Sequence, residues 1–296
     1  MALVCFNGKF LDAETPYLDA GNRSFKFGDG LFESIRLIEG KPFNLESHFK
    51  RISEGLKVLK IEMPSFSVEL LEEQIEKLVE RNSISLGGKV RLSIYREGAG
   101  TYTPVSMTGG YLIEVEPFNS NYFTLNEAGL SVDIYDDVLK PVNALSPFKT
   151  SNALFYIMAG ISARENGLDD VLLLNDNHVI IESTSSNLFI VSNGVLYTPT
   201  IEDGCIGGTF RMYLINLAIA NNIKVYECSL MPQNLFAADE IFLTNAISGI
   251  QWVSSYKNKR YYCETTKKLV DLVNNSIVSD AIKESESNSI EDFQEN

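Results

Sequence analysis

Three features of the sequence could do chemistry. Lys149 follows a proline turn in S-P-F-K-T-S-N, and its amine could act as a nucleophile or a base, although an ordinary surface lysine is the alternative. Glu182 stands among apolar residues in V-I-I-E-S-T, where an acid needs a partner unless it faces water from an edge strand. Gly207-Gly208 permits a tight turn, and the helix predicted after it offers free N–H groups at its positive end.

Several familiar catalytic arrangements are missing from the sequence. Cys5, Cys205, Cys228 and Cys263 are widely spaced, so neither a disulfide framework nor a zinc site is indicated. G-D-G-L-F-E at residues 28–33 begins like a dinucleotide loop, but glutamate replaces the third glycine. The sequence has two histidines, no G-x-x-x-x-G-K-[ST] and no G-x-S-x-G. We therefore expect no protein metal site, no Rossmann site and no Ser/His/Asp arrangement.

The stretch from Glu182 to Arg211 is far more specific. It reads E-S-T-S-S-N-L-F, then I-V-S-N-G-V, then L-Y-T, and after seven residues I-G-G-T-F-R. This pattern resembles the signature of the class IV aminotransferases, which are fold type IV enzymes that depend on pyridoxal 5′-phosphate (PLP). The family includes branched-chain aminotransferases, D-amino acid aminotransferases and 4-amino-4-deoxychorismate lyases. Thr209 departs from the aliphatic residue of the signature, and Phe210 stands where many members carry threonine.

Further blocks outside the signature extend the resemblance over residues 27–253. F-G-D-G-L-F-E-S-I-R at residues 27–36 is similar to the N-terminal block of the family, and H-F-K-R at residues 48–51 to its phosphate-binding helix. Lys149 lies 33 residues before Glu182, which is similar to the lysine-to-glutamate interval of the family.

The resemblance implies a role for each of these residues. Lys149 would form the Schiff base with the PLP aldehyde and then act as a general base. Glu182 would stabilise the protonated ring nitrogen, because a nearby opposite charge favours the ionised form. The phosphate would be bound by the guanidinium of Arg51, by the main chain at Gly208, Thr209 and Phe210, and by a second loop at Asn245 and Ala246. For His48, a structural histidine is the favoured interpretation.

Three local features favour the lyase, which releases pyruvate and leaves p-aminobenzoate for folate biosynthesis. Ser34 stands where the lyases carry a threonine, and its hydroxyl could relay a proton, although a small packing residue is the alternative. Y-R-E-G-A-G-T-Y at residues 95–102 and T-N-A-I at 244–247 are similar to lyase loops. The substrate-binding residues are expected to be Arg96, Phe27, Glu33 and Tyr102.

Other functions stay open. Glu33 is common in transaminases, so a branched-chain or D-amino acid aminotransferase that uses 2-oxoglutarate is the main alternative. A non-catalytic PLP-binding protein is a remote one, because it would tolerate the loss of Lys149 or Glu182, and both are present. Purified protein that stays colourless after PLP is added would support the non-catalytic alternative.

The helices and strands predicted around these residues indicate a two-domain α/β (α+β) protein. Residues 46–59 and 67–81 place apolar side chains on one helical face, and several short alternating runs predict strands. We expect a small domain over residues 1–118, a polar linker over 119–128 and a larger PLP-binding domain over 129–279, with the cofactor in the cleft between them. Residues 280–296 are polar and acidic, and we expect them to be disordered.

Composition limits the partners of the protein. The net charge of −14 argues against nucleic acid or an anionic membrane, because both require a basic surface. No apolar run approaches the ~18 residues of a membrane span, and the N-terminus is too polar for a secretory signal, so we expect a cytoplasmic protein. The expected partner is a small amino substrate, and the resemblance implies a homodimer in which loops of one subunit cover the site of the other.

Overall fold

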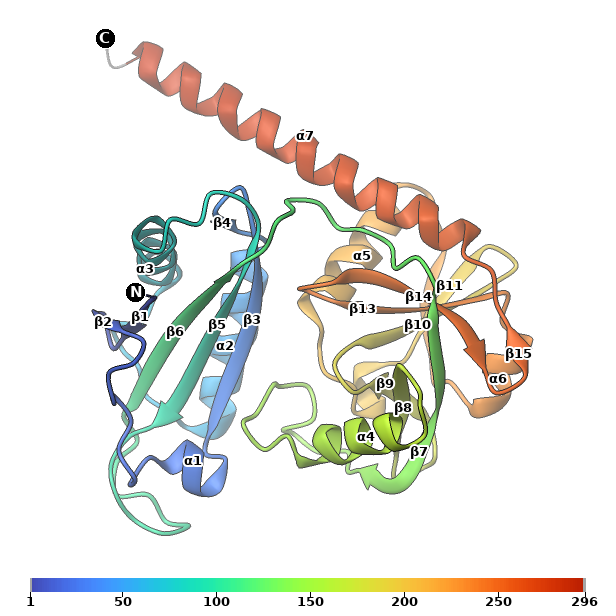
Figure 1. Ribbon diagram of the computed structural model, residues 1–296, viewed down its shortest axis with the longest axis horizontal. Coiled ribbons are helices and arrows are strands. Elements are labelled where there is room, and N and C mark those ends of the chain that lie inside the picture. Colours follow the sequence, from blue (N-terminus) through green and yellow to red (C-terminus); the bar gives the residue numbers. More distant parts are fainter. Residues whose placement is uncertain (1, 295–296) are drawn as a thin grey trace.

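The computed structural model describes residues 2–294, with side chains described for residues 2–279. The chain forms two separate sheets with helices packed around them, joined by one extended connection, and a long C-terminal helix crosses above both (Figure 1). This mixed architecture agrees with the expected fold class.

The first sheet is antiparallel and is built from the N-terminal part of the chain. Its strands are β1 (Leu3–Phe6), β2 (Lys9–Asp12), β3 (Gly30–Ile38), β4 (Lys41–Pro42), β5 (Gly88–Arg96) and β6 (Gly109–Pro117), in the order β2-β1-β6-β5-β3-β4. Its helices are α1 (Arg23–Phe27), α2 (Leu45–Leu59) and α3 (Val68–Arg81). The apolar sides of α2 and α3 bury Ile52, Leu71 and Ile75 against Ile35 and Leu92 of the sheet, so one face of the sheet forms the core.

Alternation along β3 assigns its residues to two faces. Leu31, Ile35 and Leu37 point into the core beneath α2, whereas Phe32 and Ser34 point to the opposite face. The second face of β3 is therefore free to line a site between the two sheets.

The second sheet is mixed and closes on itself. Its strands are β7 (Leu130–Lys140), β8 (Asp170–Asn175), β9 (Ile180–Ser183), β10 (Asn187–Ser192), β11 (Val195–Thr198), β12 (Val225–Glu227), β13 (Glu240–Asn245), β14 (Gly249–Tyr256) and β15 (Lys259–Arg260). Because β9 pairs with both β8 and β10, the strands β10-β13-β14-β7-β8-β9 form a ring. Val132, Leu172, Leu188 and Leu243 belong to the apolar cluster that joins these strands.

Helices and a 3₁₀ turn surround this ring. They are α4 (Leu154–Glu165), η1 (Ile201–Asp203), α5 (Thr209–Ala220), α6 (Pro232–Ala237) and α7 (Glu264–Gln294). The segment with α4 joins the parallel strands β7 and β8, and the segment with α5 joins the parallel strands β11 and β12. Within the described residues, none of the helices has the length and apolar character needed to cross a membrane.

The chain passes from the first sheet to the second between β6 and β7. Arg36 ties this connection to both sheets, because its guanidinium donates to the carbonyls of Ser120 at 2.8 Å and Ile247 at 2.9 Å. The same guanidinium lies over the rings of Phe118 and Phe123. Arg36 is therefore occupied in holding the two sheets together.

The C-terminal helix differs from the expectation. The backbone of α7 is helical as far as Gln294, whereas residues 280–296 were expected to be disordered. A helix that is already nucleated extends at little cost, and the glutamate, lysine and alanine residues after Ser279 are good helix formers. Residues 295–296 lie outside the described part of the chain.

Candidate active site

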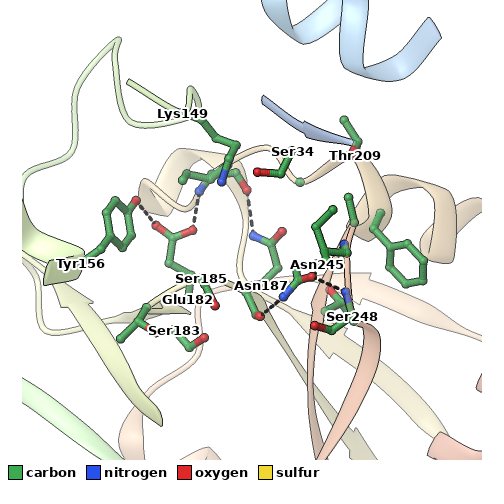
Figure 2. A pocket seen from close by; sticks show the side chains of 18 of the residues that line it. Ser34, Lys149, Tyr156, Glu182, Ser183, Ser185, Asn187, Thr209, Asn245 and Ser248 are labelled. Atoms are coloured by element: carbon green, nitrogen blue, oxygen red, sulfur yellow. Dashed lines mark hydrogen bonds between the residues drawn. The ribbon is translucent and has the colours of Figure 1, made fainter. Parts of the chain in front are cut away.

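A cavity of about 400 Å³ lies between the two sheets, within the size range of small-molecule sites. Phe32 and Ser34 of β3, Lys89 of β5 and Arg51 of α2 line one side. The rest of the lining comes from the loop at Lys149, the ends of β9, β10 and β13, and the start of α5 (Figure 2).

Lys149 enters the cavity from the loop between β7 and α4. Its main chain is bound to β3, since its carbonyl accepts the N–H of Phe32 at 2.9 Å and Ser151 N–H donates to Gly30 O at 2.9 Å. Its Nζ lies 4.6 Å from the centre of the Phe32 ring, and the described residues provide it with no ion pair. Burial, and then the positive charge of Arg51, lower the pKa of Lys149 to about 8. The site therefore holds an amine that is more readily neutral than an ordinary lysine.

Glu182 is 2% exposed at the floor of the cavity. Its Oε1 accepts from Lys140 Nζ at 2.7 Å and from the Tyr156 hydroxyl at 2.8 Å, and its Oε2 accepts the N–H of Ile206 at 2.8 Å. Burial and the adjacent carboxylate raise the pKa of Tyr156, so its hydroxyl stays protonated as the donor. These three donors hold the carboxylate in one orientation, and it points into the cavity (Figure 2).

Strand register places three polar residues in one row across the sheet. Asn187 of β10 pairs directly with Glu182 of β9 on one side and with Thr244 of β13 on the other. Residues that are paired directly present their side chains on the same face, so all three lie along the cavity floor. The hydroxyls of Thr244 and Ser183 are buried without a hydrogen-bond partner among the described residues. Buried hydroxyls are usually satisfied, and Thr244 lies in the row that faces the cavity, so its hydroxyl is placed to bind a ligand, whereas Ser183 alternates with Glu182 and points to the other face of β9.

The far end of the cavity meets the start of α5. Gly208 is the N-cap of this helix and provides no capping side chain, so the first N–H groups, including those of Thr209 and Phe210, have no partner inside the helix. A Cβ at Gly208 would lie 1.8 Å from Asn187 Oδ1, so a larger residue at the start of α5 would displace the Asn187 side chain, which donates to Ile206 O. This geometry makes an anion site from the positive end of a helix.

The loop after β13 closes the same end of the cavity. Asn245 does not present its side chain as a free ligand, because its Nδ2 donates to Ser186 Oγ at 2.9 Å and its Oδ1 accepts the N–H groups of Ile247 and Ser248. Ala246 lines the cavity with its main chain and methyl group only. Asn245 therefore shapes the turn that covers this end of the cavity.

Arg51 is held in place by Glu33. Its Nε and Nη2 donate to the two carboxylate oxygens of Glu33 at 2.7 and 2.6 Å, and its Nη1 donates to Gly207 O at 2.8 Å. Three of its five N–H bonds are used in this way, which leaves two for an anion in the cavity that it lines. His48 completes the group, with Nδ1 2.8 Å from Glu33 and Nε2 3.2 Å from Thr209 Oγ1.

This arrangement corrects the expectation that Glu33 contacts substrate. Glu33 lies on the core face of β3 with Leu31 and Ile35, so its carboxylate points toward α2 and away from the cavity. Burial opposes its ionisation, but the charge of Arg51 and the hydrogen bond with His48 lower the pKa of Glu33 to about 2. Glu33 therefore positions Arg51.

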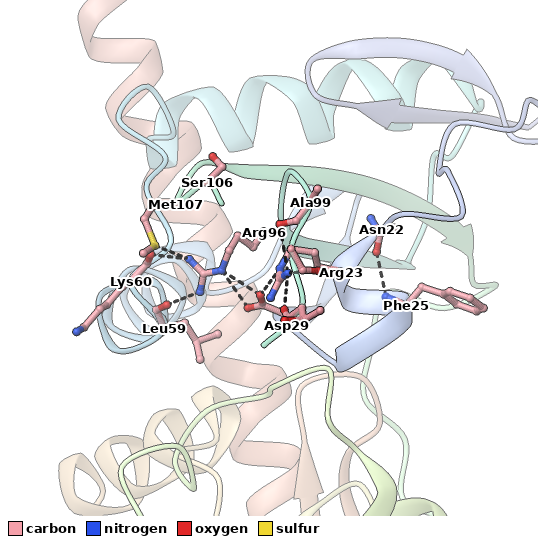
Figure 3. Close-up of polar contacts among 12 residues, drawn as sticks. Asn22, Arg23, Phe25, Asp29, Leu59, Lys60, Arg96, Ala99, Ser106 and Met107 are labelled. Carbon is pink, nitrogen blue, oxygen red and sulfur yellow. Dashed lines mark hydrogen bonds and ion pairs between the residues drawn. The ribbon is translucent and has the colours of Figure 1, made fainter. Parts of the chain in front are cut away.

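Arg96 also lies elsewhere than expected. It is buried outside the cavity, where its Nε binds Asp29 at 3.0 Å and its guanidinium donates to the carbonyls of Leu59 and Lys60 at the end of α2 (Figure 3). Arg23 binds the same Asp29 at 2.8 Å. With these partners Arg96 caps a helix, and it does not reach the cavity of its own chain.

Phe27 and Tyr102, the other expected substrate contacts, do not line the cavity either. Their ring centres lie 5.8 Å apart, and Tyr102 is 91% exposed on the loop that Arg23 holds. In contrast, Lys149, Glu182, Arg51, Ser34, Gly208, Thr209, Phe210, Asn245 and Ala246 all line it. The structure thus brings together every residue expected to bind the cofactor, whereas none of the four residues expected to bind substrate lines the cavity of its own chain.

Four residues of the site were missed in the sequence. Asn187 and Thr244 lie inside the quoted motifs E-S-T-S-S-N-L-F and T-N-A-I but were given no role, because only the strand register shows that they are neighbours. Lys140 and Lys89 had no distinguishing pattern. Lys140 binds Glu182, and Lys89 lines the cavity with one exposed partner, Glu116, at 3.5 Å.

The residues present fit PLP. A neutral-prone amine, a buried carboxylate and a helix N-terminus with an arginine border one cavity, and they match the aldehyde, ring nitrogen and phosphate of that cofactor. The unpartnered hydroxyl of Thr244 lies at the end of a strand that also carries the loop beside the helix N-terminus, where it could serve the phosphate.

Comparison with known proteins agrees with the family resemblance seen in the sequence. The family model described as amino-transferase class IV matches residues 30–256. A putative branched-chain-amino-acid aminotransferase of Methanocaldococcus jannaschii is 31% identical over 90% of this chain and 93% of its own length. A D-alanine aminotransferase of Bacillus licheniformis is 27% identical over 95% of this chain and 99% of its own length. The crystal structure of a putative 4-amino-4-deoxychorismate lyase from Legionella pneumophila is 26% identical, with a TM-score of 0.82, over 89% of this chain and 97% of its own.

Proposed function

The chain belongs to the class IV aminotransferases, enzymes that use PLP, and from that premise we propose that it is a 4-amino-4-deoxychorismate lyase. The observation that supports this choice is Ser34. Its hydroxyl lines the cavity on the same side as Lys149, and the described residues give it no hydrogen bond (Figure 2). A hydroxyl with a free proton beside the catalytic amine suits a reaction that must protonate a leaving group.

Lys149 and Ser34 would carry out different proton transfers in the reaction. PLP held by Lys149, Glu182, Arg51 and the start of α5 would supply an aldehyde for the substrate amine and an electron sink for the carbon next to it. Lys149 removes the proton from the carbon that carries the amine. The bond from the ring to the enolpyruvyl oxygen then breaks, and the oxygen keeps the electron pair. Ser34 gives its proton to the methylene carbon of the departing group, which leaves as pyruvate, and the proton held by Lys149 restores the hydroxyl.

The polarity of the cavity supports an anionic substrate. Nine of its lining residues are serines or threonines: Ser34, Thr150, Ser183, Thr184, Ser185, Ser186, Thr209, Thr244 and Ser248. Lys89 lines the same wall, and Arg91 lies over the Phe32 ring at 4.2 Å, next to Ser34 in the sheet register. A substrate with two carboxylates fits these cations and hydroxyls better than a branched aliphatic side chain does.

A branched-chain or D-amino acid aminotransferase is the second candidate. The 31% identity to a relative named as a putative branched-chain aminotransferase favours it. In that case Lys149 would return the proton to the cofactor carbon, and 2-oxoglutarate would accept the amine.

A paired assay separates the candidates. The holoenzyme is given 4-amino-4-deoxychorismate, and p-aminobenzoate release is followed; in parallel it is given 2-oxoglutarate with leucine, isoleucine or D-alanine. We expect p-aminobenzoate release to dominate. Turnover of leucine or D-alanine with negligible p-aminobenzoate would replace the lyase by the second candidate.

Variants of Ser34 test its role. Ser34→Ala is expected to slow p-aminobenzoate release by about 10²-fold, the usual minimum for general acid catalysis, while Ser34→Thr keeps the hydroxyl and most of the rate. Ser93→Ala is the matched control, because Ser93 pairs with Phe32 on the adjacent strand but does not line the cavity. Equal rates for Ser34→Ala and the control would remove Ser34 from the reaction.

We also propose that the protein works as a homodimer. Leu154, Ile157, Met158 and Ile161 form an exposed apolar stripe along α4, directly after the Lys149 loop. A stripe of this kind next to a polar cavity marks an interaction surface, and a second copy of this chain is the proposed occupant.

A further inference from the structure

Lys140 is the last residue of β7 and is buried next to Glu182. Its Nζ lies 2.7 Å from Glu182 Oε1 and 3.3 Å from the carbonyl of Ser146, and it does not line the cavity. It therefore reaches the carboxylate from the side that faces away from the ligand space. The Tyr156 ring lies 5.3 Å from the same ammonium, so the aromatic face adds a second favourable contact.

Stability alone does not account for this pair. Burying two charges costs more solvation than the pair regains, and apolar residues of similar size are often as stable or more stable. What the pair does provide is a carboxylate that stays charged in a buried place, because an adjacent positive charge favours the ionised form. The same contact helps to fix the rotation of the Glu182 carboxylate. Its Oε1 accepts two hydrogen bonds and its Oε2 accepts one, which leaves acceptor capacity on Oε2.

We propose that Lys140 is a positioning residue, which keeps Glu182 charged and oriented toward the PLP ring nitrogen without touching the cofactor. The proposal rests on the use of PLP and on the position of Glu182, and it does not depend on whether the enzyme is a lyase or a transaminase. Removing Lys140 would leave the buried carboxylate of Glu182 without its cationic partner and with one donor fewer on Oε1, so the orientation and the charge that face the ring nitrogen would no longer be maintained.

The charged and titratable groups around Glu182 come from four segments. Lys140 lies on β7, Tyr156 on α4, Lys149 on the preceding loop and Cys205 next to Ile206. Burial first, and then Glu182, raise the pKa values of Tyr156 and Cys205, so both stay neutral around neutral pH. Lys140 is thus the only permanently cationic side chain hydrogen-bonded to Glu182 among the described residues.

The test compares Lys140→Met with Lys140→Arg. In apoprotein, infrared difference spectra between each variant and its Glu182→Gln derivative isolate the Glu182 carboxyl. We expect the protonated-carboxyl band at pH 7 in Lys140→Met and its absence in wild type and Lys140→Arg. In holoenzyme, turnover of whichever substrate is active should fall at least tenfold in Lys140→Met at pH 7 and recover as the pH rises. Lys140→Arg should stay within about threefold of wild type.

Two further variants keep the outcome clear. Lys257→Met removes the partner of the exposed pair with Asp133, 3.9 Å long, and should change neither the band nor the turnover. If Lys140→Met fails to fold, Lys140→Met with Glu182→Gln removes both charges, and its PLP absorbance spectrum and PLP affinity should equal those of Glu182→Gln alone. An unshifted pH profile in Lys140→Met, or a double variant clearly different from Glu182→Gln, would overturn the proposal. If the wild-type holoenzyme has transaminase activity but releases no p-aminobenzoate, only the lyase assignment is overturned.

Discussion

Lys149 shows how a single residue acquires reactivity from its surroundings. The loop that carries it is bound to β3, and the amine lies over Phe32 without an acidic partner at hydrogen-bond distance. With a pKa of about 8, roughly a tenth of these amines are neutral at pH 7, against well under a thousandth for a lysine at its ordinary value of 10.5. The neutral form is the nucleophile and the base.

The reaction of apoprotein with PLP should follow this pKa. We expect the rate of appearance of the visible cofactor band to rise through pH 8 and to level off above it. Lys149→Ala should show no such band, whereas Lys268→Ala, an exposed lysine on α7, should match wild type. A rate that keeps rising toward pH 10.5 would mean that the amine is not perturbed.

Glu33 is a second residue whose environment decides its role. It is buried between Arg51 and His48, and its pKa falls from 4.5 to about 2. A carboxylate with a lowered pKa adds stability that is present above its unfolded pKa and is lost as the pH falls through the folded one. The difference from 4.5 to about 2 corresponds to roughly 3 kcal/mol.

The acid stability of Glu33→Gln should therefore differ from that of wild type. Urea unfolding of the apoprotein should give a variant that is less stable by roughly 3 kcal/mol above pH 5, with the gap closing between about pH 4.5 and pH 2. Glu39→Gln, at an exposed turn, is the control and should track wild type throughout. A gap that stays constant down to pH 2 would contradict the assignment.

At the scale of elements, short periodicities decide which residues meet the ligand. The alternation of β3 sends Ser34 into the cavity and Glu33 into the core, although the two are neighbours in sequence. The start of α5 can bind an anion, because Gly208 leaves the first N–H groups of the helix uncapped. Asn187 lies against that glycine and donates to Ile206 O at 2.8 Å, so strand and helix are joined at one point.

Gly208→Ala should damage this junction. Its Cβ would lie 1.8 Å from Asn187 Oδ1 and 3.2 Å from the Arg211 side chain, so the start of α5 must move. We expect PLP affinity measured by fluorescence titration to fall at least tenfold, with a loss of about 1–3 kcal/mol in stability. Gly160→Ala in α4, where nothing lies within 4 Å, should leave affinity unchanged. Normal PLP binding by Gly208→Ala would show that the phosphate lies elsewhere.

For the whole molecule, the site exists only where the two sheets meet. The first sheet supplies Ser34 and Arg51, the second supplies Glu182 and the start of α5, and Arg36 crosses between them. The exposed apolar stripe on α4 and the exposed Tyr102 lie outside this junction, so they are the surfaces available to a second copy.

Charge on the α4 stripe should break the proposed dimer. Ile157→Lys with Ile161→Lys is expected to shift the protein from dimer to monomer in sedimentation velocity, because lysine ammonium groups cannot be desolvated in an apolar interface. Ile219→Lys, an equally exposed isoleucine on α5, is the control and should remain a dimer. A wild-type protein that is monomeric at micromolar concentration would refute the homodimer.

Much of the local structure followed from the sequence. The helices expected at residues 46–59, 67–81 and 210–220 match α2, α3 and α5 closely, because amphipathic periodicity and the glycine turn are local signals. The length of β7 was not foreseeable, since it runs to Lys140 through two aspartates that are poor strand formers. The short helices α1 and α6 were not expected, because short elements draw their stability from neighbours. The strands β3 and β14 were not expected either.

The candidate site divides in the same way. The motifs that carry the resemblance singled out Lys149, Glu182 and the turn at Gly208, and all three line one cavity, since each belongs to a contiguous stretch of sequence. The partners of those groups were not foreseeable: Lys140 beside Glu182, Glu33 beside Arg51, and Thr244 in register with Asn187 are separated by many residues of chain. Arg96 lies away from the cavity of its own chain for the converse reason, because its acceptors at Asp29 and Leu59 come close only when the chain folds. Motifs are local, whereas ion pairs and strand register are set by packing between distant segments, so only the tertiary structure could decide them.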